Sequence, residues 1–154
     1  LSAVPVGRYL LDLHGGSRDG YGPSDKLCMA LQGINHLQDC QDDYRHLDRV
    51  YLPLDWMSNA GTSVADLDSL AATAALRAVF DRTIAATETL LAGARPLPGG
   101  LASRRLAMES AAILNIAERL IYLLARRDPL AERIVLSKPG YLWCCLRGAL
   151  SVWV

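Results

Sequence analysis

The chain is far richer in leucine and alanine than in the β-branched residues that favour strands. Leu and Ala supply 48 of its 154 residues, whereas Val and Ile supply 14. Leu and Ala lose little side-chain freedom in a helix, and β-branched residues pack best on a pleated sheet. Because 51% of the residues are hydrophobic, the chain can also bury a core of its own. We therefore predict a single all-α domain over residues 1–154.

Charge and cysteine spacing exclude several classes of protein. Lys and Arg number 16, as do Asp and Glu, so no net field directs the chain toward nucleic acid. The four cysteines have no CxxC spacing and no His at zinc-ligand distance, and the adjacent pair Cys144-Cys145 is too strained to bridge readily. We therefore expect buried reduced thiols in a cytoplasmic protein. No apolar run reaches the length of about 18 residues that a spanning helix needs.

Helix start and stop signals divide the chain into segments. We expect helices over residues 5–14, 24–46, 62–91 and 101–127, a short one at Asp128-Pro129, and a last one after Pro139. Ser24 is the expected N-cap of the second helix. Residues 47–60 contain Pro53 and Asn59 and are followed by Gly61, so we expect an extended connector there.

One helical segment carries a stripe of oxygen-bearing side chains. Gln32, Asn35, Asp39 and Asp43 fall within an arc of about 80° at the helical period. Two carboxylates four residues apart repel each other unless a cation lies between them. Mg²⁺ binds one or two carboxylates and shares its remaining positions with water and phosphate oxygens. The stripe therefore predicts a metal–diphosphate site, and the alternative is a solvated helix face.

Three further residues lie close to this stripe in the sequence. Arg49 and Tyr51 follow it and are suited to hydrogen-bond phosphate oxygens, although a surface Arg and a packed Tyr would look the same. His36 falls just off the stripe, where it either hydrogen-bonds a ligating carboxylate or lies at the surface.

These residues carry a resemblance to a known family. The run Gln32-x2-Asn35-x3-Asp39-x3-Asp43, followed by Asp48-Arg-Val-Tyr-Leu-Pro53, resembles the second aspartate-rich motif of the squalene and phytoene synthase family. The opening Ser2-Ala-Val-Pro-Val-Gly-Arg8 is similar to the end of the family's preceding active-site helix. The wording Ile34-Asn-His-Leu-Gln-Asp-Cys40 is most similar to the bacterial hydroxysqualene synthase branch.

The resemblance implies an isoprenoid synthase helical bundle in which Mg²⁺ holds the diphosphate of a prenyl substrate. Asp39 and Asp43 would be the metal ligands, and Gln32 and Asn35 would lie on the same catalytic wall. Arg49 and Tyr51 would bind the diphosphate. The hydrocarbon channel would be lined by Val6, Gly7, Leu10, Leu27 and Leu31.

Three functions are compatible with these residues. In the branch indicated, presqualene diphosphate would lose diphosphate and become hydroxysqualene. A squalene or phytoene synthase, which condenses two prenyl diphosphates such as farnesyl diphosphate, would use the same metal-binding face. A non-catalytic helical interaction module is the alternative from another class, with the acidic stripe as a solvated surface.

The resemblance also implies partners and a missing part. Other enzymes of the pathway and the membrane that holds a lipid substrate are the expected partners. An apolar surface toward that membrane would be formed by Trp56, Trp143, Leu150, Trp153 and Val154, and packing inside the bundle is the alternative. The family's first aspartate-rich motif is absent, so we expect the chain to be the C-terminal part of a longer enzyme, with a cavity wall exposed.

Overall fold

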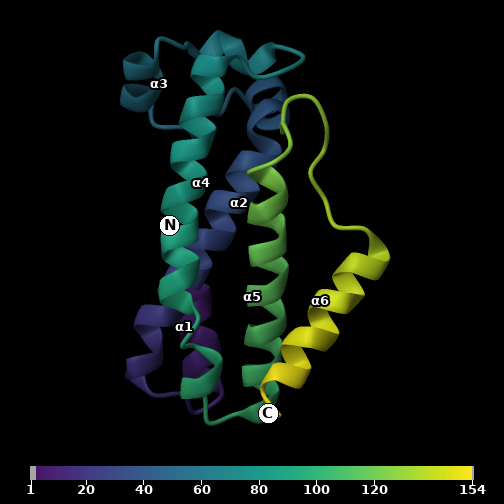
Figure 1. The fold of residues 1–154 in the computed structure, drawn as a ribbon. Coiled ribbons are helices and arrows are strands. Elements are labelled where there is room, and N and C mark those ends of the chain that lie inside the picture. Colours follow the sequence, from purple (N-terminus) through teal and green to yellow (C-terminus); the bar gives the residue numbers. More distant parts are fainter. Residues whose placement is uncertain (1–2, 154) are drawn as a thin grey trace.

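The computed structural model describes residues 3–153 and has no strand in that range. Its longer helices run alternately up and down as a bundle, with α6 lying across one side (Figure 1). Ser2, the first residue of the opening motif, lies outside the described residues, as does Val154. The elements are α1 (Ala3–Leu13), η1 (Arg18–Gly20), α2 (Tyr21–Leu47), α3 (Leu54–Ala60), η2 (Val64–Asp68), α4 (Ala74–Ala94), η3 (Pro98–Gly100), α5 (Arg104–Leu124) and α6 (Lys138–Ser151). The predicted all-α class is confirmed.

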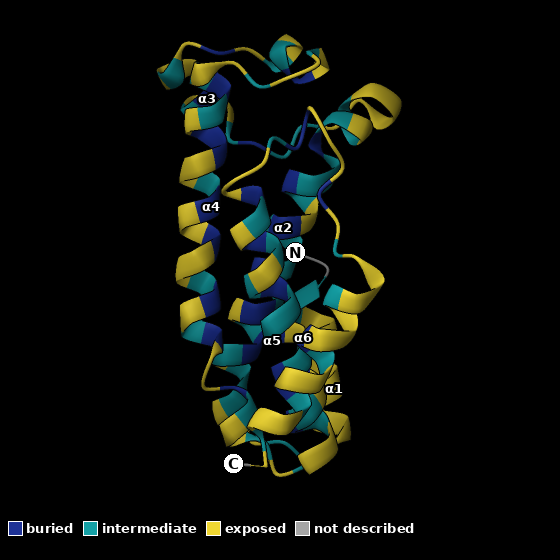
Figure 2. Ribbon diagram, turned by 45° about the vertical axis from the view of Figure 1, so that its right-hand side comes forward, coloured by how far each residue is buried: buried dark blue, intermediate teal, exposed yellow. Residues whose placement is uncertain are grey.

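The core forms where α2, α4 and α5 face one another (Figure 2). Each helix buries residues spaced three or four apart, so one face is apolar along its whole length. Phe80 on α4 is completely buried. Helices α2 and α4 approach closely at Gly33, because a Cβ there would lie 2.8 Å from Thr87 Oγ1. The core therefore holds α2 rigidly, and α2 carries the oxygen-bearing stripe.

Helix α2 begins three residues before the predicted N-cap. Tyr21 is its first residue, and Pro23 lies in the first turn, where its missing N–H needs no partner. Ser24 is buried instead of capping the helix. It lies against α1, because a Cβ on Gly7 would come within 2.8 Å of Ser24 Oγ. Packing between the two helices thus replaces the expected cap.

The predicted connector at residues 47–60 is wrong in its second half. Residues 54–60 form α3, with Pro53 at the N-cap position. The helix ends at Gly61, which has φ +74°, a conformation that glycine adopts without strain. The sequence contains both the start signal, Pro53, and the stop signal, Gly61, and the seven-residue helix lies between them.

The predicted helix over residues 62–91 is interrupted. Ser63 and Asp66 form a capping box, a start signal that the sequence contains, but it begins only the short helix η2. The backbone then turns, and the N–H of Ala72 donates a hydrogen bond of 2.7 Å to Asp128 Oδ2. Asp128 lies 56 residues farther along the chain. Thr73 starts α4 by accepting a hydrogen bond from the N–H of Leu76.

The short helix predicted at Asp128-Pro129 is likewise a turn. Asp128 uses its carboxylate to hold Ala72 and to accept from the N–H of Leu130. The predicted last helix is confirmed as α6.

The four cysteines form no disulfide among the described residues. Burial raises the pKa of the Cys40 thiol to about 12, so this thiol is unreactive at neutral pH. Within residues 3–153, no helix is both long and apolar enough to span a bilayer.

Candidate functional site

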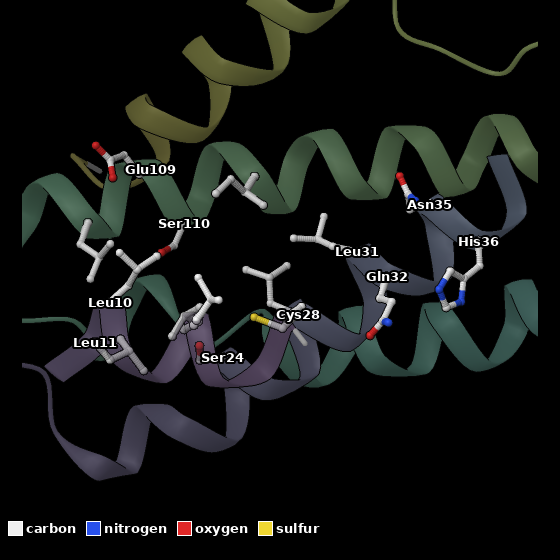
Figure 3. Close-up of a pocket in the computed structure, with 17 residues that line it drawn as sticks. Leu10, Leu11, Ser24, Cys28, Leu31, Gln32, Asn35, His36, Glu109 and Ser110 are labelled. Atoms are coloured by element: carbon white, nitrogen blue, oxygen red, sulfur yellow. The ribbon is translucent and has the colours of Figure 1, made fainter. Parts of the chain in front are cut away.

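A cavity of about 730 Å³ lies between α1, α2 and α5. The five residues predicted to line the hydrocarbon channel all lie in its wall, on α1 and α2. They are Val6, Gly7, Leu10, Leu27 and Leu31. Figure 3 shows Leu10 and Leu31 on the cavity side of their helices, with α5 across from them. Their contact with a substrate stays a prediction, and the wall they form is apolar.

Helix α1 is held against α2 by an ion pair and by a close helix contact. Arg8 Nε donates to Asp25 Oδ1 at 2.9 Å, and the guanidinium holds the pKa of the Asp25 carboxyl below its usual range. Gly7 permits the close contact, because a Cβ there would lie 2.6 Å from Cys28 Sγ. This approach sets the width of the cavity at its α1 side.

The cavity changes from apolar to polar along α2. Gln32, Asn35 and His36 line the end that follows Leu31 (Figure 3). The amide groups of the predicted stripe therefore face the same space as the apolar wall. A ligand with a hydrocarbon chain and a polar head matches this arrangement.

The two carboxylates of the stripe lie farther along the same helix. Asp39 and Asp43 do not line the cavity, and both are half-buried. At 1.5 Å per residue, Asp39 is about 6 Å beyond Asn35 along the helix axis, and Asp43 is about 6 Å beyond Asp39. The structure therefore brings Gln32 and Asn35 to the cavity and places the acids beyond its polar end.

Tyr51 holds one of these acids in place, and His36 packs on the Tyr51 ring. Tyr51 Oη donates to Asp43 Oδ2 at 2.6 Å, and this hydrogen bond raises the pKa of the Tyr51 hydroxyl. The imidazole of His36 stacks on the Tyr51 ring with centroids 3.9 Å apart. Burial lowers the pKa of His36, although the carboxylates of Asp43 and Asp39 oppose that effect. Tyr51 thus orients the Asp43 carboxylate, a contact that the sequence did not suggest.

Of the two arginines near the stripe, one is engaged in an ion pair within the described chain and the other is not. Arg49 is exposed, and its backbone N–H donates to the carbonyl of Asp43 at 3.2 Å after the left-handed residue Asp48. Its guanidinium lies close enough to Tyr51 to oppose the rise in that hydroxyl's pKa. Arg45 is engaged elsewhere, because its Nε donates to Asp68 Oδ1 at 2.5 Å. Arg49 therefore lies near the Tyr51 hydroxyl that holds Asp43, whereas Arg45 is bound to Asp68.

The donor set fits a hard divalent cation. In the described part of the chain, neither Asp39 nor Asp43 pairs with a Lys or Arg side chain. Two half-buried carboxylates one turn apart repel each other, and a bound cation relieves that repulsion. Among residues 3–153 no three His, Cys, Asp or Glu side chains group around one point, so these two acids would supply part of a coordination sphere.

The structure also adds residues that the sequence did not single out. Leu106, Glu109, Ser110 and Ile113 bring α5 into the cavity wall, which Leu97 also lines. Ser110 is buried there, and Glu109 is exposed (Figure 3). Their spacing is that of any amphipathic helix, so no local signal distinguishes them from residues of the core.

The model of one protein family matches most of this chain's sequence. Residues 1–139 match the family described as squalene/phytoene synthase. The chain belongs to the squalene/phytoene synthase family. The stripe, the cavity and Tyr51 all lie within the matched residues, whereas most of α6 lies beyond them.

Relatives within the family are similar over most of this chain. The hydroxysqualene synthase of Rhodopseudomonas palustris is 43% identical over 150 residues, which are 97% of this chain and 51% of that protein. The hydroxysqualene synthase of Zymomonas mobilis is 41% identical over 86% of this chain and 45% of its own length. The crystal structure of squalene synthase HpnC from Alicyclobacillus acidocaldarius superposes with a TM-score of 0.75 at 28% identity, covering 81% of this chain and 47% of that one. The chain thus spans about half the length of the relatives it matches.

Proposed function

We propose that the native protein is a Mg²⁺-dependent enzyme that converts presqualene diphosphate to hydroxysqualene and diphosphate. The observation that carries this proposal is a pair of half-buried carboxylates, free of cationic partners in the described chain, beyond the polar end of an apolar cavity. Similarity to hydroxysqualene synthases supports the choice of substrate and product.

One group of residues would bind the diphosphate end of the substrate, and another would line its hydrocarbon end. Asp39 and Asp43 would hold Mg²⁺, which neutralises the charge that develops on a departing diphosphate. Tyr51 keeps the Asp43 carboxylate oriented, and Arg49 is placed to hydrogen-bond phosphate oxygens. Gln32 and Asn35 would contact the head of the substrate where the cavity turns polar.

The apolar wall serves the chemistry of the carbocation. Loss of diphosphate leaves a cation that reacts with any nearby nucleophile, so bulk water must be excluded. Val6, Leu10, Leu27 and Leu31 present only hydrocarbon to the chain of the substrate. A single water positioned near the polar end would then add to the cation and, on losing a proton, supply the hydroxyl group of the product.

The proposal includes a contact with the membrane, since substrate and product are both lipids. Other pathway enzymes as partners and a cytoplasmic location stay predictions. No Gly-rich dinucleotide fingerprint occurs in the sequence, so nothing in this chain argues for a nicotinamide donor.

The test is a product analysis of the full-length native protein. Supplied with presqualene diphosphate and Mg²⁺ but no NADPH, it should release a hydroxylated C30 alcohol, identified by chromatography with mass detection. Chelation of the metal should stop the reaction. Squalene formed only after NADPH is added, or phytoene-type condensation of two prenyl diphosphates, would indicate the alternative synthases. Absence of any product, with no thermal shift on adding Mg²⁺ and a prenyl diphosphate analogue, would indicate the non-catalytic module.

A further inference from the structure

Helix α6 buries small residues and exposes large apolar ones, which is the reverse of a helix on a water-facing surface. Its buried side is made of small residues, and Gly148 lies so close to α5 that a Cβ there would be 2.4 Å from Ala112 Cα. Its outward side carries large apolar residues, each at least half exposed. They are Leu142 (59%), Trp143 (66%), Leu146 (50%) and Leu150 (63%), continued by Trp153 (62%). A water-facing helix would have charged residues at these positions.

The segment that contains α6 carries charges of one sign. Between Arg133 and Val154 the sequence contains Lys138 and Arg147 but no Asp or Glu. Arg104 of α5 packs its guanidinium 3.4 Å from the centroid of the Trp153 ring. Aromatic rings next to cations, at the border of an aliphatic stripe, are the pattern of a helix lying in a membrane interface.

A groove beside α6 provides a second, independent observation. It has a volume of about 430 Å³ and is bordered by Arg119 and Tyr122 of α5 and by Trp143 and Arg147 of α6. In the described chain neither Arg119 nor Arg147 forms an ion pair, and Glu118, which also borders the groove, is paired with Arg95. Two guanidinium groups that share a groove without a carboxylate partner match the phosphate of a lipid headgroup.

We propose that α6 is an interfacial helix that docks the protein on an anionic phospholipid bilayer. Leu142, Leu146 and Leu150 enter the acyl boundary, while Arg119 and Arg147 bind lipid phosphates. A protein partner for this surface would need acidic groups around an apolar ridge, whereas an anionic bilayer presents negative charge at its surface and hydrocarbon beneath it. The proposal deepens the proposed function, because a docked enzyme would take its lipid substrate from that bilayer.

The position of α6 leaves the cavity free when the helix is docked. Helix α6 packs on α5 opposite the cavity (Figure 3), and no described residue of α6 lines the cavity. The docking face of α6 and the candidate site therefore lie on opposite sides of α5. Vesicle binding can be measured without substrate, so its failure would not count against the enzyme activity.

The experiment is co-sedimentation of the full-length native protein with vesicles. Equimolar phosphatidylglycerol and phosphatidylcholine vesicles should bind it at least tenfold more tightly than phosphatidylcholine vesicles, and 0.5 M salt should weaken that binding. The double variant Leu142→Ser/Leu146→Ser should bind at least tenfold more weakly. The matched control is Leu54→Ser/Leu70→Ser, which changes leucines that are 61% and 87% exposed on and after α3, and it should bind like the wild type.

A second variant separates docking from folding. Arg119→Gln/Arg147→Gln leaves the apolar face intact and should reduce binding to anionic vesicles severalfold without changing the weak binding to neutral ones. Tryptophan fluorescence should be quenched by brominated lipids, and less so in a Trp143→Phe/Trp153→Phe protein, because these two side chains would enter the interface. Equal binding of wild type and both variants, or no binding to anionic vesicles, would overturn the proposal. A change of oligomeric mass in Leu142→Ser/Leu146→Ser with no vesicle binding by the wild type would assign the face to a second copy instead.

Discussion

Helices α1 and α6 both expose large apolar residues, yet their surroundings differ. Val6 and Leu10 of α1 face a cavity whose other walls come from α2 and α5. Leu146 and Leu150 of α6 are 50% and 63% exposed, and in the described chain the nearby cations Arg119 and Arg147 form no ion pair. An exposed apolar residue therefore becomes informative only when the groups around it are known: converging helices suggest a ligand site, and unpaired cations suggest an anionic surface.

The two helices also differ in how they are attached. Helix α1 rests on α2 through Gly7 and through the Arg8–Asp25 ion pair. Helix α6 rests on α5 through Gly148, which touches the backbone of α5 directly. The stability that an ion pair contributes depends on pH, whereas a contact between two backbones depends on the size of the side chain at the contact. These two differences can each be tested.

The largest effect is expected at the site that α1 helps to enclose. In the full-length protein, Asp39→Asn should lower turnover about 100-fold or more, because loss of one metal ligand removes several kcal/mol of transition-state stabilisation. The fold should be kept, and the melting midpoint without metal should stay level or rise as repulsion with Asp43 ends. Steady-state kinetics and thermal unfolding would measure both.

Asp42→Asn is the matched control for this change. Asp42 is exposed, lies on the same helix and carries the same charge, but it falls off the stripe. It should keep nearly normal turnover, and Asp39→Asn should keep normal binding to vesicles. Near-normal turnover in Asp39→Asn would contradict metal binding by this residue.

A middle-sized effect is expected from filling the two glycine contacts. Gly148→Ala should cost about 1–3 kcal/mol of unfolding free energy, since the new methyl group meets α5 backbone atoms that cannot move aside. Gly7→Ala meets the side-chain atoms Cys28 Sγ and Ser24 Oγ, so its cost should be smaller and partly offset by the higher helix propensity of alanine. Denaturant unfolding of both variants would measure the difference.

Gly22→Ala is the control for propensity alone, because nothing lies within 4 Å of the added Cβ. It should be neutral or slightly stabilising. Vesicle binding should fall in Gly148→Ala and stay normal in Gly7→Ala. An equal loss of stability in Gly7→Ala and Gly148→Ala would show that the two helices are attached alike.

The smallest effect is a pH dependence that belongs to α1. Since the Asp25 pKa is lowered in the folded protein, its stabilising contribution is complete above the unfolded value of about 3.9 and is lost as pH falls below that value. Asp25→Asn should therefore flatten the decline of the unfolding midpoint between about pH 5 and 3. Arg147→Gln on α6 should leave that decline unchanged. An identical decline in the wild type and Asp25→Asn would show that the ion pair contributes nothing.

Much of the fold follows from local signals in the sequence. Leu, Ala and the spacing of apolar residues predict helices, and the capping box at Ser63 and Asp66 marks a start correctly. The interruption before α4 could not be predicted in the same way. It depends on the hydrogen bond between Ala72 and Asp128, and no local pattern reports a partner 56 residues away.

The candidate site shows the same division. Helical periodicity is a property of neighbouring residues, so the sequence alone determined that Gln32, Asn35, Asp39 and Asp43 share one face of α2. Only the tertiary structure decided that the two amides line the cavity while the acids lie beyond it, that Tyr51 donates to Asp43, and that α5 completes the wall. The sequence likewise predicts a helix after Pro139 with leucines and tryptophans. Which side of that helix is buried depends on its packing against α5, which Gly148 contacts. Sequence periodicity defines the faces of a helix, and packing against distant residues decides which face meets the core, a ligand or the solvent.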